Sequence, residues 1–227
     1  MAQPVTADAA RLPVGGWPFA YTACYCEENI YKLVNQLLHD DQAKLLYAVF
    51  LSNPAKQLPL WRQRAGHGVH GFVLWDYHVI AVESRQSEPP LVWDLDSTLE
   101  LPCTLQTYAA ESLGVGRAAL PPEYARLFRV VPAGVFLQHF ASNRSHMCTA
   151  DGMWLAEPPA YPCITASDGT VMNLPQYIDM EGPSPTAPPS LAAVQDPFGV
   201  VLDEFQLLAA FGVPTDVFVD HAQNGSP

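Results

Sequence analysis

Three side chains in the first half of the sequence could together cleave an amide bond. Cys26 lies where an irregular stretch gives way to a helical pattern, His78 lies in a run of aromatic and β-branched residues, and Asp94 lies in the next such run. A thiol, an imidazole and a carboxylate are the groups of a cysteine nucleophile that is activated by an oriented histidine. Such a set can convert an amide into a thioester and then hydrolyse the thioester.

The position of Cys26 favours a reactive thiol. After Cys26, apolar side chains recur at the spacing of one helix face, and the carboxylates of Glu27 and Glu28 occupy the first turn, where they suit the helix dipole. A thiol at a helix N-terminus is close to free backbone N–H groups, which favour the thiolate and can hold the negative oxygen of a tetrahedral intermediate. Cys24 would lie outside this helix.

Two other interpretations of these cysteines stay open. A cysteine is often only a small, buried apolar side chain. A zinc site at Cys24 and Cys26 is the second alternative, but structural zinc sites normally contain two close pairs of ligands and the sequence shows no second pair. We therefore expect no metal.

His78 needs a carboxylate to orient it, and three aspartates compete for that role. If His78 and Asp94 lie on paired antiparallel strands, the carboxylate can reach the imidazole across the ladder, fix its tautomer and stabilise its charged form. Asp96 shares the face of Asp94, and Asp76 shares the face of His78, because side chains alternate along a strand. The pattern alone does not choose among them, and a histidine in such a strand can also be a satisfied core residue. Four further histidines show no partner spacing and are expected to be structural or exposed: His67, His70, His139 and His146.

The elements that must position these groups are helices and strands without internal repeats. Strands are expected over residues 47–52, 71–75, 77–82, 91–95 and 129–131. Helices are expected after Cys26 and over residues 105–113, 133–140 and 201–211, the last closed by Gly212. The short connection between the strands of His78 and Asp94 predicts an antiparallel pair. We therefore predict an α+β fold, a single domain with a mostly antiparallel sheet flanked by helices.

One catalytic domain is expected over residues 18–212 of the 227-residue chain. Residues 1–17 contain Ala, Pro and Gly without periodicity, which predicts a loosely ordered lead-in. Residues 181–197 are rich in Pro, Ser and Ala, which predicts a surface loop or disorder within the domain. Residues 213–227 are expected to form a C-terminal tail.

The charge and cysteine content of the chain predict which kinds of partner it binds and in which cellular compartment it works. The chain carries 11 Lys and Arg against 23 Asp and Glu, a net charge of −12, so a nucleic-acid partner is not expected. An acidic surface favours a cationic group such as a free amine, although it also serves solubility. No run approaches about 18 apolar residues, so no membrane association is expected. Five cysteines without a signal sequence argue against a secreted disulfide scaffold and predict a cytoplasmic protein, with the nucleus as an alternative. We expect a monomer.

Five motifs, taken together and in order, resemble the protein N-terminal glutamine amidohydrolase family. They are CYCEENI at 24–30, WDYHV at 75–79, DLD at 94–96, FASNRSHM at 140–147 and PPAYPCI at 158–164, and the similarity runs from about residue 21 to residue 180. The resemblance implies a core similar to papain-like enzymes and transglutaminases. It also implies a triad in which Cys26 is the nucleophile, His78 the base and Asp94 the orienting carboxylate, with no cofactor.

The reaction implied by this resemblance is deamidation of a protein's N-terminal glutamine to glutamate, with release of ammonia. In the family this step feeds the N-degron pathway, in which the new glutamate is arginylated. The partners would be proteins or peptides with a free N-terminal Gln, recognised by the α-amine and by a pocket that tells Gln from Asn, one methylene shorter. Candidate substrate contacts are Glu27 near the helix start, Trp75 in the histidine motif, and Arg144 in a polar loop.

Three other functions fit the same groups. A papain-like cysteine peptidase would attack a backbone amide, and a transglutaminase-like acyl transferase would pass the acyl group to a lysine amine. A calcium-dependent enzyme of the second kind is disfavoured, because no acidic loop with calcium-ligand spacing stands out. A non-catalytic module that binds N-terminal residues would use a similar pocket with a thiol of ordinary reactivity.

Overall fold

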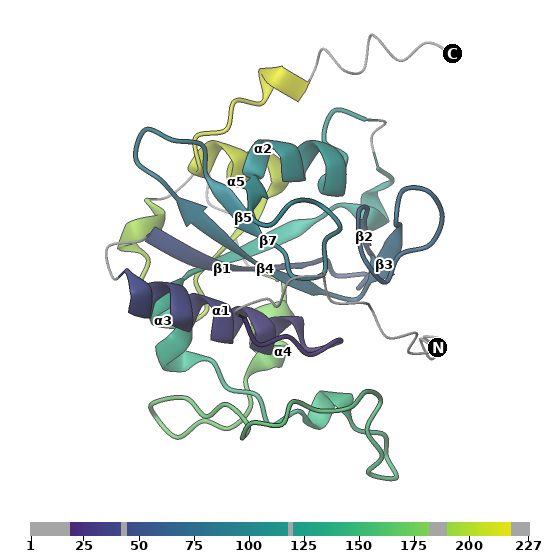
Figure 1. Ribbon diagram of the computed structural model, residues 1–227, viewed down its shortest axis with the longest axis vertical. Coiled ribbons are helices and arrows are strands. Elements are labelled where there is room, and N and C mark those ends of the chain that lie inside the picture. Colours follow the sequence, from purple (N-terminus) through teal and green to yellow (C-terminus); the bar gives the residue numbers. More distant parts are fainter. Residues whose placement is uncertain (1–18, 42–44, 118–119, 182–189, 219–227) are drawn as a thin grey trace.

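A six-stranded antiparallel sheet crosses the molecule, with helices on both of its faces (Figure 1). The computed structural model describes residues 19–41, 45–117, 120–181 and 190–218. The strand order is β6-β5-β4-β1-β7-β8, and the strands are β1 (Leu45–Ser52), β4 (His78–Ser84), β5 (Leu91–Trp93), β6 (Cys103–Thr104), β7 (Leu127–Pro132) and β8 (Val200–Asp203). A separate two-stranded ribbon consists of β2 (Leu58–Leu60) and β3 (Val73–Trp75).

Strand β1 is central because its side chains are apolar on both faces. Alternate residues point to opposite sides of the sheet, as the period of a strand requires. One core receives Tyr47, Val49 and Leu51, and the other receives Leu46, Ala48 and Phe50. The sheet therefore separates two hydrophobic cores.

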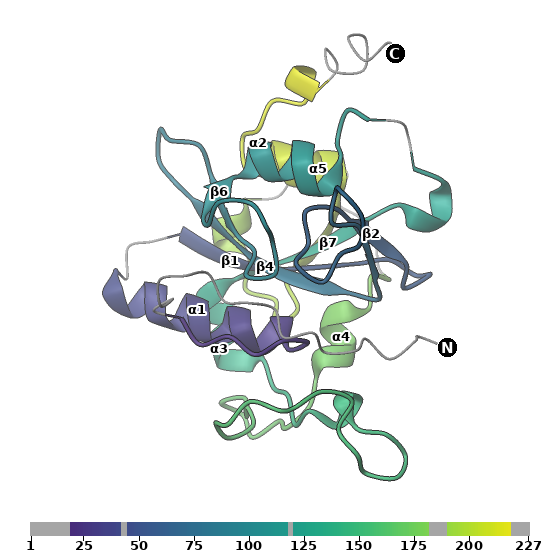
Figure 2. The same cartoon turned by 45° about the vertical axis from the view of Figure 1, so that its right-hand side comes forward.

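Helices cover each core, so the domain has three layers (Figure 2). The first core is covered by α2 (Leu105–Tyr108), the π-helical turn Ala109–Leu113 that continues it, and α5 (Glu204–Ala210). The second core is covered by α1 (Cys26–Asp40), α3 (Ala133–His139) and α4 (Leu174–Ile178). The predicted α+β class with a mostly antiparallel sheet is confirmed.

The helix that carries the candidate nucleophile begins at Cys26, as the sequence predicts. Its apolar stripe is buried against the second core, where Ile30, Leu33 and Val34 are almost inaccessible to solvent. Burial of this one face holds the helix in place, since a helix of this length is marginal without tertiary packing. The N-terminus of α1 is thereby fixed close to β4.

Most predicted elements are confirmed, including the antiparallel pairing of β4 with β5, in which Ala81 lies opposite Trp93. The predicted helix over residues 201–211 is wrong in its first turn, because Val201 and Leu202 extend strand β8 along β7. The helix begins only at Glu204, after Asp203 accepts a hydrogen bond from the backbone of Gln206 and completes a capping box. Apolar side chains alone did not reveal this boundary; the cap residue marks it.

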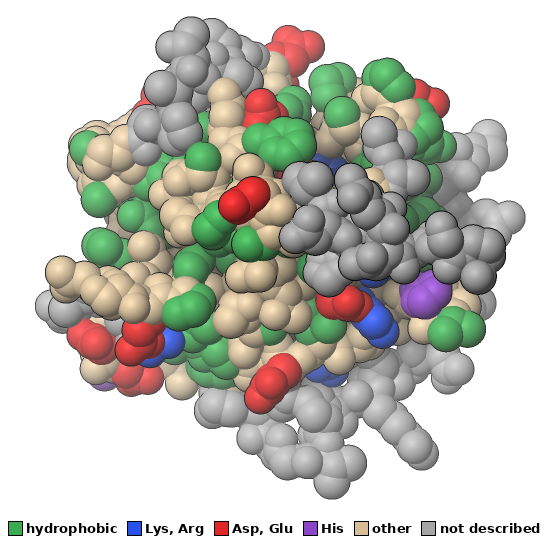
Figure 3. Space-filling view, turned by 90° about the horizontal axis from the view of Figure 1, so that it is seen from above, with side chains coloured by type: hydrophobic (Ala, Val, Ile, Leu, Met, Phe, Trp, Pro, Cys, Tyr) green, Lys and Arg blue, Asp and Glu red, His purple; other side chains and the backbone are tan. Residues whose placement is uncertain are grey.

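Several expectations fall outside the described residues: the lead-in over 1–17, most of the Pro-rich stretch (182–189) and the end of the tail (219–227). The expected limits of the catalytic domain stay a prediction. Among the described residues, no helix is both long and apolar enough to cross a membrane. Seen from the side of α2 and α5, acidic side chains are scattered over the surface and basic ones are few (Figure 3).

Candidate active site

Cys26 is the first residue of α1, and its thiol lies beside the beginning of β4. The backbone of Val79 is close enough to lower the pKa of the Cys26 thiol, so the thiol lies near the residue that follows His78. The sulfur is also 3.6 Å from Oε2 of Glu27. No side chain caps the N-terminus of α1, which leaves its first backbone N–H groups available to a ligand.

His78 and Asp94 are in direct contact in the buried interior. His78 begins β4 and Asp94 directly follows β5. Because Ala81 lies opposite Trp93, Asp94 falls diagonally across from His78 on the same face of the sheet. His78 Nε2 lies 2.8 Å from Asp94 Oδ1, and both side chains are almost completely buried.

The Asp94 carboxylate accepts hydrogen bonds from three further groups. The backbone N–H of Asp96 donates to Oδ1 at 3.0 Å. The Gln63 amide and the Tyr108 hydroxyl donate to Oδ2 at 3.0 and 2.9 Å. Both lone-pair regions of the carboxylate are therefore occupied, and its orientation toward His78 is fixed.

Trp75 supports the same pair from the other side of the imidazole. Its ring stacks on that of His78 with the centroids 5.7 Å apart and the planes 12° from parallel. Its indole N–H donates to Gln63 Oε1 at 3.3 Å, so Trp75, Gln63 and Asp94 form a chain around the histidine. The sequence did not identify Gln63 or Tyr108.

The two rival aspartates have other partners. Asp96 accepts a hydrogen bond from the Tyr21 hydroxyl at 2.5 Å. Asp76 accepts one from the backbone N–H of Tyr77 at 2.9 Å. Among the three candidates, Asp94 is the one that the structure brings into hydrogen-bond contact with His78.

Burial and neighbouring charges shift the acid–base properties of the site. Burial, followed by the Glu27 carboxylate, raises the pKa of Cys26 well above its ordinary value, and the backbone of Val79 opposes this only in part. This direction is opposite to the effect expected of a helix start. Burial disfavours the charged form of His78, yet the Asp94 carboxylate outweighs it and raises the pKa of His78. Burial likewise opposes the charge of Asp94, but His78 and the Gln63 amide lower the pKa of Asp94.

A second polar cluster adjoins the thiol and contains Glu27, Tyr77 and His146. The Tyr77 hydroxyl donates to Glu27 Oε2 at 3.0 Å. His146 Nε2 lies 3.4 Å from Glu27 Oε1 and 3.5 Å from the Tyr77 oxygen. The sequence suggested that His146 was only structural or exposed. The structure instead places it against Glu27, the residue that contacts the Cys26 sulfur.

Arg144 forms an ion pair with Glu28, the residue that follows Glu27 in α1. Its guanidinium binds both oxygens of Glu28, at 2.9 and 2.8 Å, and a third nitrogen donates to the carbonyl of Pro159 at 3.1 Å. The ion pair is buried on both sides. Arg144 thus fastens the segment that carries His146 to the start of α1.

One donor group among the described residues could hold a metal ion: His78, Asp94 and Asp96, whose ligand atoms lie within 4.8 Å of one another. The hydrogen bonds already made by the Asp94 oxygens fit an orienting carboxylate better than a metal ligand. All five cysteines are free thiols.

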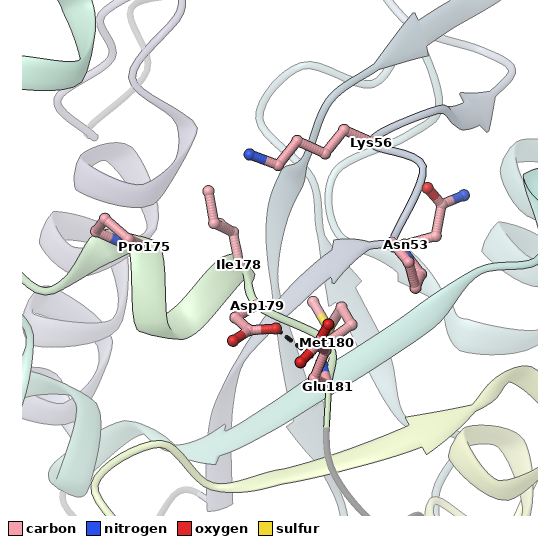
Figure 4. A pocket seen from close by; sticks show the side chains of 8 residues that line it. Asn53, Lys56, Pro175, Ile178, Asp179, Met180 and Glu181 are labelled. Carbon is pink, nitrogen blue, oxygen red and sulfur yellow. Dashed lines mark hydrogen bonds between the residues drawn. The ribbon is translucent and has the colours of Figure 1, made fainter.

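A cavity of about 260 Å³ lies elsewhere, between the end of β1 and α4 (Figure 4). Lys56, Asp179 and Glu181 contribute to its walls, and the Glu181 backbone N–H donates to the Asp179 carboxylate at 2.9 Å. The amide of Asn53, also in the wall, already donates to the carbonyls of Gln57 and Glu123. None of Cys26, His78 and Asp94 lines this cavity.

The sequence of this chain is similar to those of known proteins. The chain is 43% identical over 219 residues to the protein N-terminal glutamine amidohydrolase of Arabidopsis thaliana, which covers 92% of this chain and 96% of that protein. It is 42% identical over 163 residues to the enzyme of the same name from Homo sapiens, covering 71% and 78%. The protein of that name from Oryza sativa subsp. indica is 47% identical over 172 residues, covering 71% and 73%. The model of the family described as N-terminal glutamine amidase matches residues 21–211, which include the three candidate residues. The chain belongs to the N-terminal glutamine amidase family.

Proposed function

We propose that the protein hydrolyses the side-chain amide of an N-terminal glutamine, with Cys26 as nucleophile, His78 as general base and acid, and Asp94 as the carboxylate that orients His78. The observation that carries the proposal is the buried contact of 2.8 Å between His78 and Asp94, next in the chain to Val79, whose backbone lowers the pKa of the Cys26 thiol. The names of the relatives support the same substrate and reaction.

The first step forms a thioester. Nε2 of His78 is engaged with Asp94, so Nδ1 is the ring nitrogen that exchanges a proton with the Cys26 thiol. The thiolate attacks the amide carbon of the glutamine side chain, and the uncapped N–H groups at the start of α1 hold the negative oxygen. His78 then returns the proton to the nitrogen, the C–N bond breaks, and ammonia leaves.

The second step regenerates the thiol. His78 takes a proton from a water molecule, which attacks the thioester carbon, and the C–S bond breaks as the thiolate is protonated again. The product is an N-terminal glutamate. Asp94 stabilises the imidazolium formed in both steps, since its carboxylate is locked by the Gln63 amide and the Tyr108 hydroxyl.

The three predicted substrate contacts take different parts in this proposal. Glu27, next to the sulfur, is the substrate contact. Trp75 stacks on His78, which supports a positioning role for its ring. Arg144 uses three nitrogens on Glu28 and Pro159, which supports positioning of the 142–148 segment rather than direct binding.

Ammonia release from matched peptides that begin with Gln, Asn or acetylated Gln tests this function. We expect release from free Gln alone, loss of activity in Cys26→Ala, and a fall in kcat of about 10³-fold or more in Asp94→Asn, because an oriented imidazole is lost. Release from acetylated Gln would indicate a general glutaminase or an acyl transferase, and cleavage of the peptide bond would indicate a peptidase. A folded protein that binds the peptide without releasing ammonia would be a binding module.

The cellular setting belongs to the same proposal. Five free thiols fit a reducing compartment, which supports a cytoplasmic or nuclear enzyme that feeds glutamate N-termini to arginylation. The monomeric state stays a prediction, and light scattering during size-exclusion chromatography checks it.

A further inference from the structure

Two consecutive glutamates at the start of α1 are both fully buried but differ in their partners. Glu28 is paired with the guanidinium of Arg144. Glu27, within the part of the chain that the structure describes, has no permanently charged cation in contact, and its Oε1 accepts no hydrogen bond. A buried carboxylate without a cation is costly because its charge has lost hydration. The surroundings of Glu27 therefore suit a cation that arrives with a ligand.

The groups around Glu27 match the hydrogen-bonding needs of an ammonium ion, which has three N–H donors. Burial and Glu27 raise the pKa of Tyr77 well above its ordinary value, so its hydroxyl stays protonated and donates to Glu27. One lone pair of the Tyr77 oxygen faces His146 Nε2 at 3.5 Å, and the other can accept from a ligand. His146 Nε2 lies 3.4 Å from Oε1 without the geometry of a hydrogen bond, and its Nδ1 is buried without a partner. Because the one proton of the Tyr77 hydroxyl goes to Glu27, His146 Nε2 is the donor in its 3.5 Å contact with the Tyr77 oxygen. Nδ1 is then the ring nitrogen that can accept from a ligand.

We propose that Glu27, Tyr77 and His146 form the subsite that binds the α-ammonium group of the substrate, and that this bound charge activates Cys26. The inference rests on the proposed function and deepens it. The Glu27 carboxylate is 3.6 Å from the sulfur, so a nitrogen bound there is near the thiol. In an N-terminal glutamine, four covalent bonds separate that nitrogen from the amide carbon. Asparagine has one bond fewer and presents its carbon out of position for attack.

Activation follows from the position of the Glu27 charge. A carboxylate this close to the sulfur opposes ionisation of the thiol, in agreement with its effect on the pKa of Cys26. An ammonium ion bound to Glu27 offsets that charge, so the thiolate forms more readily when the correct substrate is present. A substrate without the amine then loses kcat as well as affinity.

The test combines two peptides with two proteins. One peptide begins with Gln, and the other is identical except that hydrogen replaces the α-amine. We expect wild type to lose about 30-fold or more in kcat/KM on the desamino peptide, the loss typical of truncating one partner of a buried charge pair. Glu27→Gln should be slower than wild type on the Gln peptide but faster than wild type on the desamino peptide, because the charge that opposes the thiolate is gone. This reversal separates the subsite from a general loss of structure.

His146 is tested with two substitutions. His146→Ala should raise KM for the Gln peptide and leave KM for the desamino peptide unchanged. His146→Asn places an amide close to the position of Nδ1 and should restore most of the affinity. Equal effects of His146→Ala on both peptides would remove His146 from the subsite.

Two results would overturn the proposal as a whole. Wild type could process both peptides equally, or Glu27→Gln could keep the full preference for the amine. Binding of the two peptides to Cys26→Ala, measured by fluorescence, provides a readout that does not need turnover. If wild type releases no ammonia but Cys26→Ala binds only the peptide with the amine, and Glu27→Gln abolishes that preference, the proposed reaction fails and the subsite stands.

Discussion

The Asp94 carboxylate receives four hydrogen bonds, from His78, Gln63, Tyr108 and the backbone of Asp96. A carboxylate with this many donors keeps its charge in a buried position and does not rotate. The imidazole is consequently held between a fixed acceptor and the ring of Trp75. At the scale of the residue, the main feature of the site is that all four hydrogen bonds to Asp94 hold its carboxylate in the position that orients His78.

The contact between His78 and Asp94 should make the free energy of unfolding depend on pH in two ranges, one at acidic pH from Asp94 and one at higher pH from His78. Asp94 has a folded pKa below its ordinary 3.8, so its contribution is present above that pH and is lost as pH falls through the lower folded value. His78 has a folded pKa above its ordinary 6.5, so its contribution is present below that pH and is lost as pH rises through the folded value. We expect the difference in the free energy of unfolding between wild type and Asp94→Asn, from urea titrations, to be largest between pH 3.8 and 6.5. A difference that does not vary with pH would contradict this assignment.

The charge of Glu27 should be visible in the reactivity of Cys26. Glu27→Gln removes a charge that raises the pKa of the thiol, so the pH profile of Cys26 alkylation by iodoacetamide should move to lower pH. Peptide mapping by mass spectrometry reads the reaction at Cys26 alone. Asp40→Asn, an exposed carboxylate at the far end of the same helix, is the matched control and should leave the profile in place. An unshifted profile in Glu27→Gln would exclude the electrostatic effect.

Local patterns were sufficient to nominate Cys26 and His78, because a helix start and a strand can be recognised from them. The same patterns left Asp76, Asp94 and Asp96 as rival carboxylates, and only the family resemblance selected Asp94. The sequence was not sufficient for Gln63 or His146. Gln63 lies 31 residues from Asp94, and His146 lies 69 residues from Tyr77. No local periodicity marks a side chain whose partner is this distant, so these contacts need the folded chain.

At the scale of the element, the segment over residues 142–164 is fastened to the start of α1 by a few long-range contacts. The Tyr25 hydroxyl donates to the carbonyl of Ala156 at 3.2 Å, and the backbones of Ser142 and Ile164 form an antiparallel bridge. The ion pair of Arg144 with Glu28 completes the attachment. Because His146 lies within this segment, the geometry around Glu27 depends on it.

Breaking this ion pair should be strongly destabilising. Arg144→Met leaves the Glu28 charge buried without a partner, which costs about 3–5 kcal/mol of unfolding free energy. The double variant Glu28→Gln with Arg144→Met should recover a large part of that loss, since neither charge is then unpaired. Urea unfolding of the two single variants and the double variant measures the coupling. Strictly additive losses would show that the pair does not act as a unit.

The switch from β8 to α5 depends on one cap residue. Asp203→Ala removes the acceptor for the Gln206 N–H and should lower the free energy of unfolding by about 1 kcal/mol. Asp203→Asn keeps an oxygen acceptor and should lose much less. Thermal unfolding of the two variants at one pH distinguishes them, and equal losses would mean that the side-chain cap does not stabilise the helix.

The same switch explains why one element was mispredicted. Residues 201–211 carry apolar side chains at spacings compatible with a helix, but Val201 and Leu202 pair with β7 instead. Strand pairing with a distant segment overrides a local helical pattern. Other elements were predictable because their apolar pattern matches their burial. Strand β1 has two apolar faces and lies between two cores, and α1 has one apolar face and covers one core.

At the scale of the whole molecule, two hydrophobic cores on either side of one sheet hold the site at the ends of β4 and β5. The acidic surface surrounds this framework, with a net charge of −12. Charge of one sign attracts ligands of the opposite sign before contact. Substrate charge beyond the first residue should therefore affect the rate of capture.

This effect is measurable with peptides that differ only after the N-terminal Gln. We expect a peptide with lysines at the following positions to have a higher kcat/KM than one with glutamates, since a protein of net charge −12 attracts the cationic chain. The ratio should fall as ionic strength rises from about 0.01 M to about 1 M, because the screening length falls roughly tenfold. A ratio that does not change with salt would indicate specific contacts instead.

The neighbouring strands of the sheet also come from two contiguous stretches of the sequence. The strands β6, β5, β4 and β1 all come from residues 45–104 and are adjacent, whereas β7 and β8 come from residues 127–203. A cut in the connection between Leu113 and Pro122 would leave Cys26, His78 and Asp94 in one fragment and His146 in the other. The two fragments would meet along β1 and β7, whose apolar side chains need each other to be buried. We therefore expect two fragments cut at this connection to reassociate through β1 and β7, and recovery of activity would measure that reassociation.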